Sequence, residues 1–136
     1  GRPREIKKMN GNKINTVHVE GDKIIMSRDV DNIFDTNEPV ECAHISQFMY
    51  RRKAWGPVPE YSVIGFTEET SLSFIIRENG YRLMFLPLAV NFHLQAPRGG
   101  IREFTAEELL KMRQEDDIIF RNRWLKILKE WDAGKK

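Results

Sequence analysis

Hydrophobic and polar positions along the chain first indicate a hairpin near the N-terminus. Residues 14–19 alternate apolar and polar side chains, as a half-buried strand does. The polar stretch 20–23 contains Gly21 and reads as a turn, and the apolar run 24–26 follows it. Residues 1–12 are polar and are predicted to form a lead-in to a single domain over 13–136.

The clearest helix is predicted from residue 67 to residue 80. Apolar residues there recur at helical spacing: Leu72, Ile75 and Ile76. The hydroxyl of Thr67 can accept from the free N–H groups of the first turn. Gly80 stands where a left-handed residue often ends a helix, and Tyr81 would then pack back on Ile76.

Extended segments flank this helix, and a helical tail ends the chain. Strands are predicted over 40–50, 81–86 and 90–94, and the last two are joined at Pro87. Thr105 and Glu108 predict a capping box at the start of the tail. The tail then carries an amphipathic pattern: Leu109, Met112, Trp124, Ile127, Leu128 and Trp131. The acidic run at 115–117 is predicted to divide it into two helices. The expected class is therefore α/β, close to α+β, with a short mixed sheet, a central helix and a long helical tail from about residue 105.

Composition narrows the function classes. The 136 residues are 40% hydrophobic and 31% charged, which is typical of one globular domain. No apolar run approaches the roughly 20 residues of a membrane span. The one cysteine, Cys42, and the lack of a signal-peptide pattern favour a cytoplasmic location. A net charge of +2 with interspersed signs argues against a nucleic-acid binder. The basic, polar start without an initiator Met favours a processed end or a piece of a longer chain.

Two carboxylates, Glu68 and Glu69, open the predicted central helix. The helix macrodipole stabilises negative charge there by about 0.3–1 kcal/mol per residue. An ionised, fixed carboxylate is what a general base must be before it takes a proton. Acidic residues also favour helix N-termini for stability alone, and spacing by itself favours that second interpretation.

Two histidines lie on predicted strands. His93, on the polar side of strand 90–94, could ligate a divalent cation or contact a phosphate. His44 belongs to a polar set at 41–46 that could line a sugar pocket. For both, an ordinary structural or exposed histidine stays open as the alternative.

A glycine pair after the strands could bind an anion. Backbone N–H groups at Gly99 and Gly100 can approach an anion closely, and Arg98 and Arg102 flank them with guanidinium groups suited to phosphate. A plain turn with solvated arginines is an equal alternative. The basic run at 51–53 is most simply a solvated turn.

The order of these segments is more specific than any one of them. The chain contains, in sequence, FMYRR at 48–52, a Pro/Gly-rich loop at 56–62, GFTEETSLSF at 65–74, NGYRL at 79–83, LPLAV at 86–90, His93, and GGIR at 99–102. This order resembles the second half of family 2 glycosyltransferases of the GT-A fold, especially short bacterial and phage-type members. The resemblance covers roughly residues 40–122.

The resemblance implies roles for particular residues. Glu69 would be the catalytic base that deprotonates an acceptor hydroxyl for in-line attack on the anomeric carbon, with inversion. Glu68 would bind or orient the acceptor. His93 would lie near the metal and the diphosphate, and the turn at 98–102 would cover the leaving nucleoside diphosphate. Mg²⁺ or Mn²⁺ on the diphosphate would assist as a Lewis acid.

The chain also departs from the family pattern. Glu69 stands where Asp is more common, and Ser71 replaces a frequent acidic residue. Asp29 and Asp31 carry the letters of the Asp-x-Asp metal motif outside its context, so no metal ligation is assigned to them. The nucleotide-binding half that normally lies upstream is missing. The expected function is thus hexosyltransferase-like transfer from a nucleotide sugar to a hydroxyl acceptor, with the other half supplied by a longer chain or a partner. The alternative is a non-catalytic structural or interaction module on the same scaffold.

Overall fold

The computed structural model describes residues 14–29, 38–40, 42–43, 49–85 and 98–134. The elements run in the order β1 (Ile14–Glu20), β2 (Lys23–Asp29), β3 (Glu38–Val40), β4 (Cys42–Ala43), η1 (Arg52–Ala54), α1 (Glu68–Glu78), β5 (Leu83–Phe85), η2 (Gly100–Glu103) and α2 (Ala106–Ala133), where η marks a 3-10 turn. This mixed content of helices and strands confirms the α/β character predicted from the sequence.

The strands form two small antiparallel groups. β1 lies between β2 and β4, and β3 pairs with β5. The predicted hairpin is confirmed, because β1 and β2 pair from Glu20↔Lys23 outward around a turn in which Gly21 has φ 59°. All pairings among the described strands are antiparallel, so the mixed sheet is not seen there. Of the predicted strand over 40–50, Val40 ends β3, Cys42–Ala43 form β4, and residues 49–50 are not in a strand; the predicted strand 90–94 lies outside the described residues.

Helix α1 ends as its sequence predicts. Gly80 has φ 79°, a left-handed conformation that glycine adopts without a Cβ clash. The Tyr81 N–H then donates to the Ile76 carbonyl at 3.1 Å, and the Tyr81 ring packs against the cluster of Ala54, Leu72 and Ile76. This is the six-to-one bond of a Schellman motif, with its usual hydrophobic contact.

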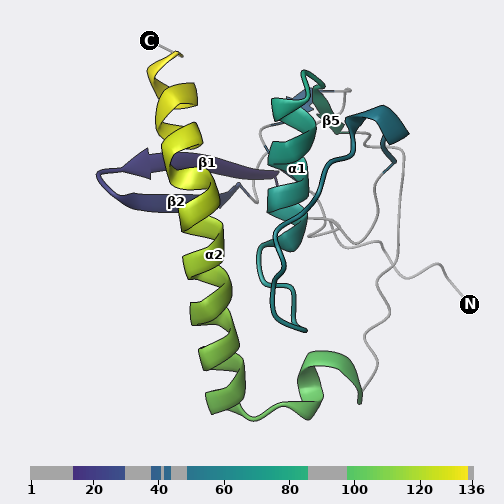
Figure 1. The fold of residues 1–136 in the computed structure, drawn as a ribbon, viewed down its shortest axis with the longest axis vertical. Helices are drawn as coiled ribbons and strands as arrows, with labels where there is room; N and C mark the ends of the chain where they lie inside the picture. The colour runs from purple at the N-terminus through teal and green to yellow at the C-terminus, as the bar shows by residue number, and fades with distance from the viewer. Residues whose placement is uncertain (1–13, 30–37, 41, 44–48, 86–97, 135–136) are drawn as a thin grey trace, which may run out of the picture.

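Helices α1 and α2 pack side by side and run in the same direction (Figure 1). Phe74 of α1 is completely buried between Phe120 and Trp124 of α2, with its ring edge-on to Trp124 at a centroid distance of 5.1 Å. A second cluster of Ala54, Leu72 and Ile76 covers another side of α1. Every residue from 70 to 76 is consequently buried, and α1 is the central helix of the described fold.

Helix α2 is continuous from Ala106 to Ala133, so the predicted division at 115–117 is wrong. Asp116 lies on the buried face of α2, where its carboxylate accepts hydrogen bonds from another segment instead of breaking the helix. The capping box is confirmed, since the Glu108 N–H donates to the Thr105 hydroxyl and the Thr105 N–H donates to the Glu108 carboxylate. Those bonds from Thr105 lower the pKa of Glu108.

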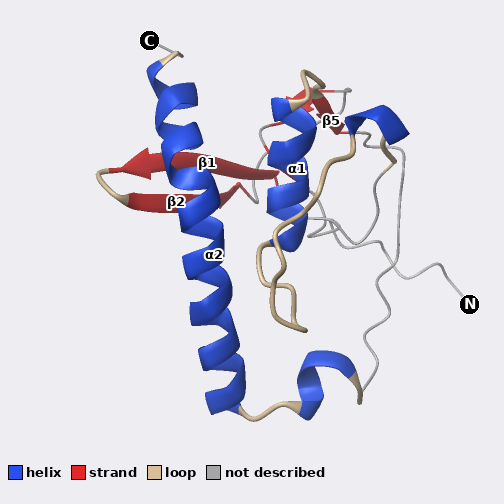
Figure 2. Ribbon diagram, viewed as in Figure 1, coloured by secondary structure: helices blue, strands red, loops and turns tan. Residues whose placement is uncertain are grey.

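The hairpin of β1 and β2 lies across the C-terminal half of α2 (Figure 2). Val17 is buried against α2, and the Val19 N–H donates to the Asp132 carboxylate at 3.0 Å. At the hairpin tip, the Lys129 ammonium pairs with the Asp22 carboxylate at 2.6 Å. The N-terminal half of α2 is not covered by the hairpin and faces the segment that leads into α1.

Candidate functional site

The start of α1 is the candidate site, because it carries both predicted carboxylates. Glu68 and Glu69 both lie in the first turn of α1, where Glu69 is half-buried and Glu68 is exposed. The Glu68 carboxylate folds back over Gly65, so closely that a Cβ at Gly65 would stand 2.6 Å from Glu68 Oε2. Gly65 itself has φ 57°, a left-handed conformation that favours glycine at this position.

The residue before α1 does not cap the helix in the way the sequence predicts. Thr67 has φ 71°, and its hydroxyl donates to the Phe66 carbonyl instead of accepting from the first turn. Thr67 is the one non-glycine residue with positive φ in the described ranges. A β-branched residue in this conformation costs on the order of 1–3 kcal/mol and persists only where its surroundings fix it.

Asp116 of α2 fixes the loop that carries this strained residue. Its completely buried carboxylate accepts from the Ser62 N–H at 2.7 Å, the Ser62 hydroxyl at 2.8 Å and the Phe66 N–H at 2.8 Å. Two successive turns lie between those anchors and α1, closed by bonds from the Gly65 N–H to the Ser62 carbonyl and from the Glu68 N–H to the Gly65 carbonyl. The position of the first turn of α1 is thus set by a side chain about fifty residues away.

A second polar link joins the same loop, α1 and α2. Ser71 is completely buried, and its hydroxyl accepts from Trp124 Nε1 at 2.8 Å and is also hydrogen-bonded to the Tyr61 hydroxyl. Burial raises the pKa of Tyr61, so its phenol stays protonated. These bonds direct the Ser71 hydroxyl into the core.

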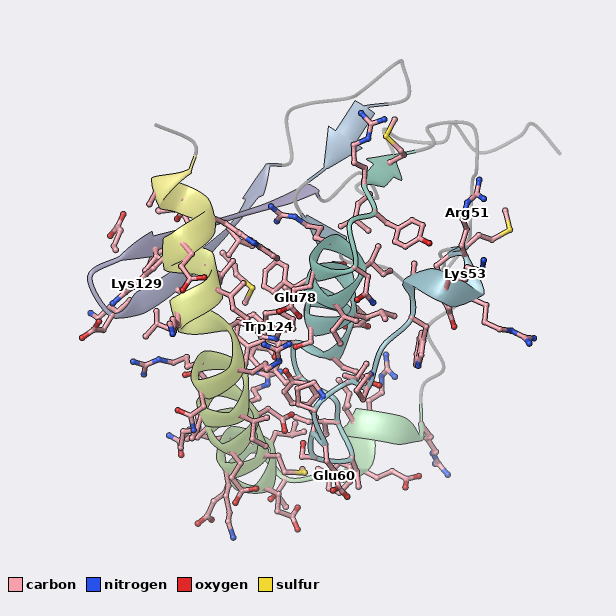
Figure 3. All side chains as sticks on the ribbon, turned by 45° about the horizontal axis from the view of Figure 1, so that its top comes forward. Arg51, Lys53, Glu60, Glu78, Trp124 and Lys129 are labelled. Atoms are coloured by element: carbon pink, nitrogen blue, oxygen red, sulfur yellow. The ribbon has the colours of Figure 1, made fainter. Side chains whose placement is uncertain are left out.

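The glycine turn lies at the same end of the molecule as the start of α1. Gly99 (φ 91°) and Gly100 (φ 59°) lead into η2, with Arg98 and Arg102 exposed. Figures 1 and 3 place η2 beside the loop that turns near Glu60 before it enters α1. Within the described ranges, no hydrogen bond or ion pair joins residues 98–102 to the two carboxylates of α1.

Two predicted site residues, His44 and His93, lie outside the described residues. In the described part of the chain, no three side chains of His, Cys, Asp or Glu gather as a metal would require. The expected Mg²⁺ or Mn²⁺ consequently has no ligand set among these residues, and the ligand role of His93 stays a prediction.

The sequence analysis missed Asp116, although a signal for it exists. Asp116, Phe120, Trp124 and Leu128 recur every four residues and are the buried residues of α2. This spacing puts the aspartate on the same helix face as three core side chains. A carboxylate on such a face must find hydrogen-bond donors, and the donors here belong to the loop before α1.

In comparisons with known proteins, no family model matches the sequence, and no curated protein or solved structure matches the chain. None of the described helices combines the length and the apolar character needed to cross a bilayer.

Proposed function

We propose that this chain is the acceptor-side half of an inverting glycosyltransferase, with Glu69 as the catalytic base. The observation that carries the proposal is the start of α1, where a strained Thr67 precedes two carboxylates and a buried aspartate holds the loop in place. Conformational strain of this kind concentrates at functional sites, where the surrounding structure maintains it. The order of motifs along the sequence, which resembles that of family 2 glycosyltransferases, supports glycosyl transfer as the reaction class.

The proposed reaction gives Glu69 a single proton transfer. Its carboxylate takes the proton of an acceptor hydroxyl as that oxygen attacks the anomeric carbon of a nucleotide sugar. The new C–O bond forms while the bond to the diphosphate breaks, and the nucleoside diphosphate leaves with the electron pair. Glu68 orients the acceptor, and Arg98 and Arg102 offset negative charge on the leaving group. The donor half comes from a longer chain or a partner, and no step is assigned to a metal.

The test produces the Glu69→Gln and Glu107→Gln variants in the native source of the protein. Each variant is isolated together with any chain that copurifies. Glu107 is an exposed acid in the first turn of the other long helix, so it controls for the loss of a helix-terminal charge. Transfer from a panel of nucleotide sugars to hydroxyl acceptors is followed by product formation. Glu69→Gln is expected to lower kcat by about 10²–10⁴-fold, because a positioned base contributes that much, while Glu107→Gln keeps normal turnover.

Two results would contradict the proposal. Full turnover by Glu69→Gln would remove the base, and a product that retains the donor's anomeric configuration would exclude inversion. If no donor is used although the native assembly is intact, the alternative of a non-catalytic module is favoured.

A further inference from the structure

The turn η1 carries an exposed aromatic pair beside three cations. The rings of Tyr50 and Trp55 stack at a centroid distance of 5.1 Å and an angle of 27°, yet these residues remain 45% and 47% exposed. Arg51, Arg52 and Lys53 lie between them in the sequence and are all exposed. Among the described residues, Tyr50, Arg52 and Trp55 line an open hollow of about 450 Å³.

The backbone under this pair is held tightly against α1. Ala54 is 2% exposed, and its carbonyl accepts from Asn79 Nδ2 at 3.1 Å. On the other side of Trp55, a Cβ at Gly56 would stand 2.7 Å from Ile75 Cγ2, so only glycine allows this close approach. Trp55 is therefore fixed between two anchored neighbours, and its ring is presented to solvent from a preorganised turn. Preorganisation of this kind lowers the entropic cost of binding a ligand.

The positive charge around the Tyr50–Trp55 pair indicates which charge a ligand there should carry. The stretch from 49 to 59 contains three cations and no acidic residue. In the described part of the chain, no carboxylate forms an ion pair with Arg51, Arg52 or Lys53. Figure 3 shows Arg51 and Lys53 at the side of the molecule remote from α2. A ligand at this turn would meet positive charge that no described carboxylate neutralises in an ion pair, so the ligand is expected to be an anion.

We propose that the hollow at η1 binds an anionic saccharide, a sugar ring that carries a carboxylate or a phosphate. The C–H face of the ring packs on the Trp55 indole, and the anionic group accepts hydrogen bonds from the Arg52 guanidinium, whose planar fork suits both groups. A single-stranded nucleic acid also uses aromatic and basic residues, but it needs a basic groove that follows several nucleotides. Here the cations belong to one short turn, which favours a ligand of one or two rings.

The hollow lies at the opposite end of α1 from Glu69. Since Asn79 follows the last residue of α1 and that helix has 11 residues, the two ends are about 16 Å apart. On this geometry, and resting on the proposed function, the hollow holds a part of an extended acceptor remote from the reacting hydroxyl. Binding at such a site would raise the affinity for the acceptor and align its reacting hydroxyl with Glu69, without contact to the reacting atoms.

The test titrates the full chain with glucuronic acid, glucose 6-phosphate and short oligosaccharides that contain glucuronic acid, each beside its neutral counterpart. Binding is followed by NMR at the indole N–H signals, and Trp55→Phe assigns the signal of Trp55. The anionic ligands are expected to shift that signal and to leave the buried Trp124 signal unchanged. Trp55→Ala and Arg52→Gln should each weaken binding by about tenfold or more. Lys126→Gln, which removes an exposed cation on α2, should not weaken it.

The following results would contradict the proposed binding site. Equal binding of neutral sugars, unchanged affinity in Trp55→Ala, or no binding at millimolar ligand would overturn the proposal. Tighter binding of a nucleoside monophosphate or a single-stranded oligonucleotide would assign the hollow to nucleotides instead. Glu69→Gln is expected to bind these saccharides normally. Loss of transfer therefore tests the proposed function, whereas loss of saccharide binding tests the hollow alone.

Discussion

Helix α2 holds two other parts of the molecule by charged side chains, and the two attachments differ in burial. Asp116 holds the loop before α1 from a completely buried position, with three donors on one carboxylate. Lys129 holds the hairpin tip through Asp22, an ion pair whose aspartate side chain is 80% exposed. Hydrogen bonds to a buried charged group are strong because water cannot replace them, whereas an exposed ion pair competes with solvent and salt. The start of α1 should therefore be fixed firmly and the hairpin tip only loosely.

Removing the buried carboxylate should have the largest effect on stability. Asp116→Ala leaves the N–H groups of Ser62 and Phe66 without their acceptor. We expect the free energy of unfolding in urea to fall by about 3–5 kcal/mol. Asp117→Asn changes the exposed neighbouring acid and should alter stability by less than about 0.5 kcal/mol. Equal effects of the two variants would show that the buried bonds do not hold the loop.

The link through Ser71 should be next in size. Ser71→Ala removes the acceptor of Trp124 Nε1 and a partner of the Tyr61 hydroxyl, both inside the core. An unsatisfied buried polar group costs about 1–3 kcal/mol, so a loss of about 2 kcal/mol is expected in the same urea measurement. A loss of less than about 0.5 kcal/mol, the size typical of an exposed substitution, would contradict the role given to Ser71.

The sequence predicts the locally determined parts of this fold. The hairpin turn, the Gly80 end of α1 and the capping box of Thr105 each depend on residues a few positions apart, and the structure has all of them. The conformation of Thr67 depends instead on tertiary contact. Local propensity favours a side-chain cap there, but Asp116 holds the preceding loop in a shape that places Thr67 in the left-handed region.

The candidate site likewise has features that the local sequence predicts and features that depend on tertiary contact. The sequence places Glu68 and Glu69 in the first turn of a helix, and they lie there. Stacking of Tyr50 on Trp55 could not be predicted, since it requires the 3-10 turn between them and the anchoring of that turn on α1. The break predicted at 115–117 rested on local composition alone. The four-residue spacing from Asp116 to Leu128 instead indicates one continuous helix with a buried face.

The exposed pair at the hairpin tip should have the smallest effect, and pH and salt should reveal it. The hydrogen bond and charge of Lys129 lower the pKa of Asp22 below its ordinary value of 3.8. A carboxyl group with a lowered pKa in the folded state stabilises the protein above its unfolded pKa, and this contribution is lost as the pH falls through the folded pKa. Asp22→Asn should thus be slightly less stable than the parent chain at pH 7. The difference should disappear below the folded pKa, and also in about 1 M salt, where the Debye length is about 3 Å. Thermal unfolding of both chains across pH and salt measures this difference. A loss as large as that of Asp116→Ala, or one that salt does not reduce, would show that the two attachments do not differ in strength as their burial indicates.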